Sequence, residues 1–176
     1  MAGHERIFVG IGANLGAALA TVRRAATELN AVSRTKLVAA SSLYRSAPVD
    51  ASGPDYINAV AELRSELEPL ELLAALQVIE QAHGRTRPFQ NAPRTLDLDL
   101  LFYGAREHRD NRLVLPHPRV AERAFVLAPL LELAPDGRWA DGRSFVTALA
   151  TVLDGVPHQR IERLPGRRPG SGTVSG

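Results

Sequence analysis

Two aspartates in the segment Arg94-Thr-Leu-Asp-Leu-Asp-Leu100 carry the sharpest chemical signal of the sequence. The alternation of leucine and aspartate predicts a strand, in which successive side chains point to opposite faces. Asp97 and Asp99 then project from one face, with Cα atoms ~6.6 Å apart at ~3.3 Å rise per residue. Hard carboxylate oxygens without a nearby His or Cys favour Mg²⁺, and two ions ~4 Å apart could share such a pair. The pair alone leaves open the alternative of an ordinary strand with acids on its solvent face.

Six arginines lie on either side of this pair of carboxylates, namely Arg85, Arg87, Arg94, Arg112, Arg119 and Arg123. The planar guanidinium group binds phosphate oxygens through paired hydrogen bonds. Each arginine taken singly is typical of a solvated surface. As a group around two carboxylates, they indicate a site where a polyphosphate is held by cationic side chains and by metal.

Known nucleotide and hydrolase motifs are absent from the sequence. Lys36 is the only lysine and has no glycine near it, which excludes a P-loop kinase. The glycines of Gly10-Ile-Gly-Ala-Asn-Leu-Gly16 have the wrong spacing for a dinucleotide fingerprint, and we interpret them as a strand end followed by a helix cap. No Gly-x-Ser-x-Gly and no histidine pair at i,i+4 supports a serine or zinc hydrolase.

The composition is typical of one globular domain, with 176 residues of which 45% are apolar and 23% charged. The net charge is +2, but residues 155–176 hold four arginines against one glutamate. We therefore expect a nearly neutral domain over residues 1–154 and a flexible basic tail over residues 155–176. Since there is no cysteine, signal peptide or long apolar run, the sequence predicts a cytoplasmic protein with no membrane partner.

The periodicity of the chain predicts an α+β fold. Strands are expected over residues 6–12, 37–44, 56–67 and 95–103, with one helix from an Asn14 cap to about Val32 and a second from Pro69 to Gly84. This β-α-β-β-α-β order is the ferredoxin-like pattern, an antiparallel sheet with both helices on one face and the other face free for an active site. C-terminal additions are expected as a short strand at 113–115, a partly helical segment over 118–133 and a helix over 144–153.

Eight segments occur in the order of a known family between residues 6 and 150: Gly10-Ile-Gly-Ala-Asn-Leu, Ser42-Leu-Tyr-Arg-Ser-Ala-Pro, Pro54-Asp-Tyr-Ile-Asn-Ala, Gln77-Val-Ile-Glu80, Gly84-Arg-Thr-Arg87, Ala92-Pro-Arg-Thr-Leu-Asp-Leu-Asp-Leu-Leu-Phe-Tyr-Gly104, Leu115-Pro-His-Pro-Arg and Arg123-Ala-Phe-Val-Leu-Ala-Pro-Leu. With them the chain resembles the 6-hydroxymethyl-7,8-dihydropterin pyrophosphokinases of folate biosynthesis. The resemblance implies an enzyme that moves a pyrophosphoryl group from ATP to the hydroxymethyl oxygen of a reduced pterin and releases AMP. It also implies that Asp97 and Asp99 hold two Mg²⁺ ions, and that Arg85 and Arg94 steady the transferring group.

The resemblance further implies two sets of binding residues. For the pterin they are Tyr56 and Phe125 on opposite faces of the ring, Asn58 at its amide-like edge, and the backbone around Ser46 and Val49. For ATP they are Gln77, Glu80, Arg87, Arg94, Leu100, Arg112, His117 and Arg123. The chain departs from the family pattern in the arginine loop, where a common tryptophan is absent and Asn91-Ala92 stand instead. It also departs at Val114, where a hydroxyl is common, and at Pro118, where an aromatic is common.

The sequence leaves two other function classes as alternatives to this enzyme. A ferredoxin-like nucleic-acid-binding module would use the basic tail, but only 5% of residues are aromatic and no RNP-like strand occurs. A metal-dependent phosphohydrolase would release phosphate without a pterin acceptor. We expect ATP and the dihydropterin as the partners of a monomer that binds no nucleic acid.

Overall fold

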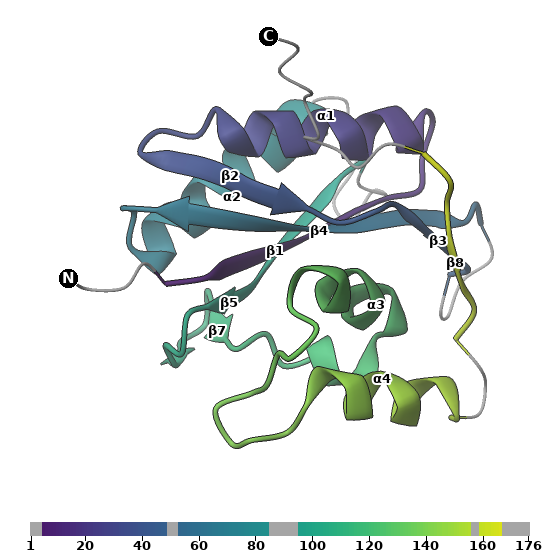
Figure 1. Cartoon of the computed structure of the whole chain (residues 1–176). Coiled ribbons are helices and arrows are strands. Elements are labelled where there is room, and N and C mark those ends of the chain that lie inside the picture. The colour runs from purple at the N-terminus through teal and green to yellow at the C-terminus, as the bar shows by residue number, and fades with distance from the viewer. Residues whose placement is uncertain (1–4, 49–52, 85–94, 156–158, 167–176) are drawn as a thin grey trace, which may run out of the picture.

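The computed structural model describes residues 5–48, 53–84, 95–155 and 159–166. Its centre is a six-stranded sheet in which every strand pairing is antiparallel. Helices α1 and α2 lie above the sheet, and α3 and α4 lie below it (Figure 1). No helix in the described ranges is long and apolar enough to cross a membrane.

The main sheet has the order β5-β1-β4-β3-β8, and β2 also pairs with β4. Its strands are β1 (Ile7–Ala13), β2 (Thr35–Ala40), β3 (Tyr44–Ser46), β4 (Tyr56–Ser65), β5 (Asp97–Tyr103) and β8 (Ile161–Arg163), while β6 (His108–Arg109) and β7 (Val114–Leu115) form a separate pair. The helices are α1 (Ala18–Asn30), α2 (Pro69–His83), α3 (Ala124–Leu133) and α4 (Phe145–Leu153), with a 3₁₀ turn η1 (Val120–Glu122) before α3.

The ferredoxin-like pattern is confirmed, with β1 at the centre between β4 and β5. Helix α2 begins with Pro69 at its first turn, is capped by Glu68 and Glu71, and ends at Gly84, as its sequence predicts. The predicted strand over 37–44 is instead two strands, β2 and β3. The cap predicted at Asn14 is wrong, because α1 begins at Ala18 and the Asn14 amide instead donates to the carbonyl oxygen of Pro54 at 3.5 Å.

The sheet has an apolar cluster on each face. Above it, Leu96, Leu98 and Leu100 of the β5 region join buried side chains of α1 and α2. Below it, Phe102 packs with Trp139 and with Phe145 of α4. The face expected to be free for a site is therefore partly covered by α3 and α4, and the rest of this face remains for a cavity.

The C-terminal segment corrects the predicted domain boundary. Ile161–Arg163 forms strand β8 and pairs with Tyr44–Ser46 of β3, at the edge of the sheet (Figure 1). The backbone N–H of Leu164 also donates to the carbonyl oxygen of Leu43 at 2.8 Å. This part of the predicted flexible tail thus belongs to the folded domain, because an edge strand offers unpaired backbone groups that a following segment can satisfy. Residues 167–176 of that tail lie outside the described residues.

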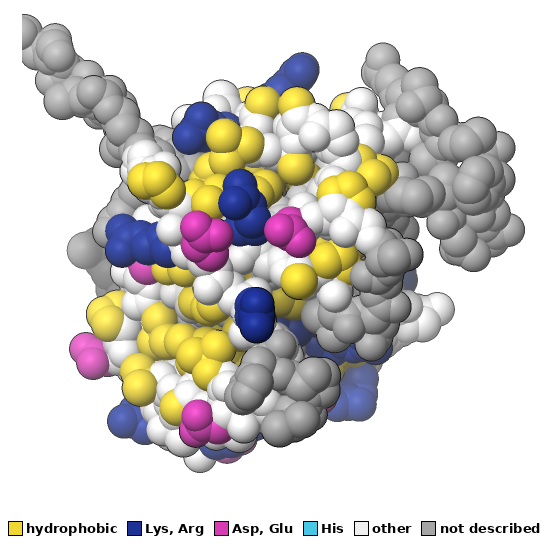
Figure 2. Space-filling model, turned by 90° about the vertical axis from the view of Figure 1, so that its right-hand side faces the viewer, with side chains coloured by type: hydrophobic (Ala, Val, Ile, Leu, Met, Phe, Trp, Pro, Cys, Tyr) yellow, Lys and Arg dark blue, Asp and Glu magenta, His cyan; other side chains and the backbone are white. Residues whose placement is uncertain are grey.

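Charged side chains are mixed on the molecular surface. On the face shown in Figure 2, Lys and Arg side chains are interspersed with Asp and Glu and with apolar groups. Elsewhere on the described surface, charged side chains form pairs of opposite sign, for example Arg34 with Glu66 and Arg143 with Asp141. Among the described residues of the face in Figure 2 there is no one-sided basic stripe of the kind that marks many nucleic-acid-binding proteins.

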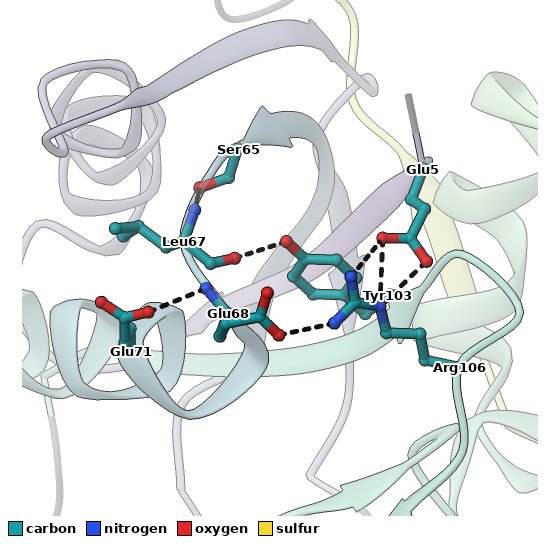
Figure 3. A network of polar contacts seen from close by, with 7 residues as sticks. All are labelled: Glu5, Ser65, Leu67, Glu68, Glu71, Tyr103 and Arg106. Carbon is teal, nitrogen blue, oxygen red and sulfur yellow. Dashed lines mark hydrogen bonds and ion pairs between the residues drawn. The ribbon is translucent and has the colours of Figure 1, made fainter. Parts of the chain in front are cut away.

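A polar network ties the end of β5 to the starts of α2 and β1 (Figure 3). Arg106 lies between Glu5 and Glu68, with N···O distances of 2.9 and 2.7 Å, and its guanidinium carbon is 4.7 Å from the centre of the Tyr103 ring. The Tyr103 hydroxyl donates to the carbonyl oxygen of Leu67, and burial raises the pKa of this tyrosine. These contacts hold the strand that carries the two aspartates.

Candidate active site

A cavity of about 580 Å³ opens on the lower face of the sheet beside α3. Its lining comes from five parts of the chain that are distant in sequence: β1, β3, β4, β5 and the η1–α3 region, joined by one residue of the C-terminal segment. The side chains and backbone that line it belong to Gly10, Ile11, Gly12, Ser46, Ala47, Tyr56, Asn58, Ala59, Asp97, Asp99, Arg119, Glu122, Arg123, Phe125, Val126 and Gln159.

Two glycines form the floor of this cavity. Gly12 pairs with Asp97 on one side and Asn58 on the other, and Gly10 pairs with Asp99 in the next register position on that face. Cross-strand partners share a face of the sheet. The aspartates therefore lie on one side of the glycines and the Asn58 amide lies on the other. The interpretation of this segment as a strand end is confirmed, since both glycines lie in the last four residues of β1, and only the helix cap after it is wrong. The glycines themselves add no side chain to the floor.

Asn58 is the polar anchor of the cavity. It is only 4% exposed, and its Nδ2 donates to Ser46 Oγ at 2.7 Å. This bond orients the side-chain amide and brings two of the predicted pterin residues together. A Cβ placed on Gly12 would lie 3.2 Å from Asn58 Oδ1, so glycine at this position also leaves room for the amide.

Aromatic side chains form the walls above this floor. Tyr56 begins β4 and Phe125 is the second residue of α3, and both line the cavity. The guanidinium carbon of Arg123 lies 5.6 Å from the centre of the Phe125 ring. Rings beside a buried amide suit a flat heterocycle with polar edges. The structure therefore brings Ser46, Tyr56, Asn58 and Phe125 together as the sequence predicts.

A smaller cavity of about 280 Å³ shares Asp99 with the first. Leu100, Arg112 and His117 line it, so three of the predicted ATP residues meet there. Val114 and Pro118, where the chain departs from the family pattern, line it as well. Asp99 is therefore a residue that the two cavities share.

His117 is anchored through its backbone and its ring. Its backbone N–H donates to the carbonyl oxygen of Leu101 at 2.8 Å, and its Nδ1 accepts from the backbone N–H of Arg119 at 3.2 Å. Burial lowers the pKa of His117, Asp99 opposes this effect, and Arg123 and Arg119 reinforce it. A neutral ring with Nδ1 as acceptor carries its proton on Nε2, which can donate a hydrogen bond to a ligand.

Acidification is expected to destabilise the protein through His117. Because its folded-state pKa is depressed, the unfolded state binds more protons as the pH falls through the unfolded value of about 6.5. Urea denaturation at pH 7.5, 6.5 and 5.5 should show a falling free energy of unfolding, and His117→Gln should flatten this fall. His83→Gln is the comparison, because His83 lies on α2 and lines neither cavity. If the free energy of unfolding of His117→Gln falls with pH as steeply as that of the wild type, the lowered pKa of His117 is contradicted.

Helix α2 supplies one polar group next to β5. Glu80 Oε2 accepts the backbone N–H of Leu98 at 3.0 Å, between the two aspartates. Gln77, one turn earlier, is exposed and lines neither cavity. The structure therefore places Glu80 beside the site but does not bring Gln77 into it. Of the remaining predicted residues, Val49, Arg85, Arg87 and Arg94 lie outside the described residues.

Three polar residues that line the cavity, Arg119, Glu122 and Gln159, do not belong to the predicted site. Arg119 was counted among the arginines around the aspartates, so the charge pattern did carry a signal for it. Glu122 and Gln159 also line the cavity. Gln159 had no such signal, because it lies in the segment that the sequence places outside the domain.

The fold and the site together define a class of protein, namely a ferredoxin-like α+β protein with an aromatic-lined cavity next to a pair of carboxylates. Residues 8–135 match the family model described as 7,8-dihydro-6-hydroxymethylpterin-pyrophosphokinase (HPPK), and the chain belongs to this family. The resemblance found in the sequence is thereby confirmed, and the nucleic-acid-binding alternative has no support from the comparisons.

Curated relatives carry the corresponding name. The 2-amino-4-hydroxy-6-hydroxymethyldihydropteridine pyrophosphokinase of Pseudomonas aeruginosa is 44% identical over 163 residues, which cover 92% of this chain and 98% of that protein. The protein of the same name from Synechocystis sp. is 46% identical over 144 residues, covering 82% of this chain and 73% of that protein.

Solved structures show the same fold. The Plasmodium falciparum HPPK-DHPS wild type with SDX-DHP superimposes with a TM-score of 0.68 at 11% identity. The match covers 86% of this chain and 45% of that chain, so the present chain spans less than half of the solved one.

Proposed function

We propose that this chain transfers a pyrophosphoryl group from ATP to the hydroxymethyl oxygen of 6-hydroxymethyl-7,8-dihydropterin in folate biosynthesis. The observation that carries the proposal is the position of Asp99, which lines both the aromatic cavity and the smaller cavity beside it. A pterin in the first cavity and a triphosphate reaching from the second would meet at the aspartate pair. Membership of the family and the names of the relatives support the same reaction.

The pterin is held in the aromatic cavity. Tyr56 and Phe125 stack on the ring, and the Asn58 amide, oriented by Ser46, binds its polar edge. Val49 would complete the edge contacts, as the resemblance implies. Since Asn58 is buried, a ligand without matching polar atoms would leave its amide unpaired, which gives the cavity its selectivity.

The nucleotide is held by side chains around the smaller cavity. Arg112 and the Nε2–H of His117 bind phosphate oxygens, and Leu100 contributes an apolar wall. Arg123, which lines the larger cavity beside the Phe125 ring, neutralises charge on the transferring group. Gln77, Glu80 and the arginines Arg85, Arg87 and Arg94 are assigned to ATP and to the transferring group from the resemblance.

The aspartate pair fits Mg²⁺ by the chemistry of its donors. Within the described part of the chain no group of three or more His, Cys, Asp and Glu side chains could hold a metal alone. Two carboxylates on one strand face supply hard oxygen donors, and phosphate oxygens and water would fill the remaining positions. Bound there, Mg²⁺ would neutralise charge on the phosphates and help to lower the pKa of the attacking hydroxyl group.

The reaction needs positioning more than it needs a strong base. The hydroxymethyl oxygen forms a bond to the β-phosphorus, the bond from that phosphorus to the oxygen bridging the α-phosphate breaks, and AMP leaves while the hydroxyl proton is lost. Fixing the ring between Tyr56 and Phe125 sets the direction of attack. The cytoplasmic location and the monomeric state stay predictions from the sequence.

A coupled assay of AMP release tests the proposal. The purified chain with Mg²⁺ and ATP is expected to form AMP only when 6-hydroxymethyl-7,8-dihydropterin is present. Phosphate release without the pterin would instead support the phosphohydrolase alternative. If no AMP forms with or without the pterin, the proposed function is overturned.

A further inference from the structure

Gln159 reaches the active-site cavity from the C-terminal segment and bonds at both ends of its amide. Its Oε1 accepts the backbone N–H of Ala124 at 2.9 Å, and its Nε2 donates to the carbonyl oxygen of Glu122 at 2.7 Å. Its side chain also lines the cavity. Gln159 lies beyond residues 8–135, the part of the chain that the family model matches.

The two bonded backbone groups flank a single residue, Arg123. The Glu122 carbonyl belongs to the peptide before Arg123, and the Ala124 N–H belongs to the peptide after it. Arg123 is the N-cap of α3, with φ −121° and ψ 105°, and the helix has no side-chain cap of its own. By bonding both peptides, Gln159 holds these two torsions and supplies an acceptor for an N–H at the start of the helix.

The direction of two side chains in the cavity depends on this backbone. Arg123 and Phe125 lie on either side of Ala124, and the Arg123 guanidinium carbon is 5.6 Å from the centre of the Phe125 ring. A change in the Arg123 torsions would turn its side chain and shift the first turn of α3, which carries Phe125. Arg123 and Phe125 would therefore move together in the larger cavity.

The segment that carries Gln159 is itself anchored. Strand β8 pairs with β3, and Arg163 Nε donates to Ser42 Oγ at 3.1 Å. Arg163 also lies 4.0 Å from a carboxylate oxygen of Glu132, on α3. Gln159 therefore stands on a segment that is tied both to the sheet edge and to the helix it caps.

We infer that Gln159 is a positioning residue of the active site, which sets Arg123 and Phe125 for the pterin and makes the C-terminal segment part of the catalytic unit. This inference rests on the proposed function. It predicts that losing the two hydrogen bonds weakens pterin binding and slows transfer, because small misplacements of positioned groups are costly.

Gln159→Met is the sharpest variant, because it keeps the length of the side chain and removes both hydrogen bonds. We expect the KM for the pterin to rise about tenfold and kcat to fall several-fold, while the KM for ATP changes about twofold or less. A direct titration with the fluorescent oxidised 6-hydroxymethylpterin should show the same rise in Kd. Arg160→Met is the matched control at the exposed neighbouring position. It should leave kcat, both KM values and the Kd unchanged.

A double-mutant cycle separates positioning from a general structural role. In a Phe125→Ala background, Gln159→Met should have little further effect on the Kd of the pterin, since the ring it positions is gone. Fully additive effects would overturn the inference. So would a Gln159→Met enzyme with wild-type constants.

A second variant serves if Gln159→Met does not fold. Gln159→Glu keeps an acceptor for Ala124 but places an oxygen against the Glu122 carbonyl, and it should raise the pterin KM at least as much. Wild-type constants in this variant would overturn the inference. If the wild-type chain neither binds the pterin nor forms AMP, the proposed function fails and this inference with it. If the wild-type chain does both and the Gln159 variants keep its constants, the inference alone is refuted.

Discussion

Asp97→Asn and Asp99→Asn are each expected to lower turnover about a thousandfold, since each removes one charged oxygen ligand from a site that must neutralise a triphosphate. Both side chains are half-buried on the cavity face of β5, and Asp99 lines both cavities. The amide keeps the size of the carboxylate, so packing is unchanged. AMP formation with saturating ATP and pterin, at several Mg²⁺ concentrations, measures the effect.

The stability of these variants provides the control. Two carboxylates on one strand face repel each other, so Asp99→Asn should leave the melting temperature unchanged or raise it. Glu66→Gln is the matched control, because this exposed glutamate forms only a surface ion pair with Arg34, and it should keep full activity. Near wild-type turnover in either aspartate variant would refute the role of the pair.

Phe125→Ala should raise the KM for the pterin ten- to a hundredfold, because stacking of an aromatic side chain on a heterocycle contributes about 1–3 kcal/mol. Phe125 lines the larger cavity but not the smaller one, which Arg112 and His117 line. The KM for ATP should therefore change far less. Initial rates with each substrate varied in turn give the two constants.

Two further variants make this experiment decisive. Phe125→Tyr keeps the ring and should stay close to the wild type. Val146→Ala removes an exposed apolar side chain of α4 and should change neither constant. Equal rises in the KM values for the pterin and ATP would mean that Phe125 supports the whole site rather than the pterin.

Much of the sheet and of the catalytic face could be predicted from local patterns. The alternation around Asp97 and Asp99 placed the leucines in the core, where Leu96, Leu98 and Leu100 are at most 4% exposed. It also placed both aspartates on the cavity face. These predictions succeeded because a period of two along a strand decides which face each side chain occupies, whatever the strand pairs with.

Other parts of the site depend on contacts between distant segments. The role of the β1 glycines in the cavity could not be predicted from the sequence, because it depends on the position of Gly12 between Asp97 and Asn58 in the register of three strands. The cap at Asn14 failed for a related reason, since its amide bonds the distant Pro54 carbonyl instead of starting the helix. The residues that neighbour Gly12 and Asn14 in the sequence do not indicate which distant residues these two will contact.

The sequence by itself determined the fold class, the family and the pair of carboxylates, because these depend on short-range periodicity and on ordered motifs. Only the tertiary structure decided which glycines form the cavity floor, how α3 covers the lower face and that Gln159 reaches the Arg123 backbone. The physical reason is that hydrogen bonds between remote backbone groups depend on strand register and segment docking. Both are properties of the assembled sheet and not of neighbouring residues.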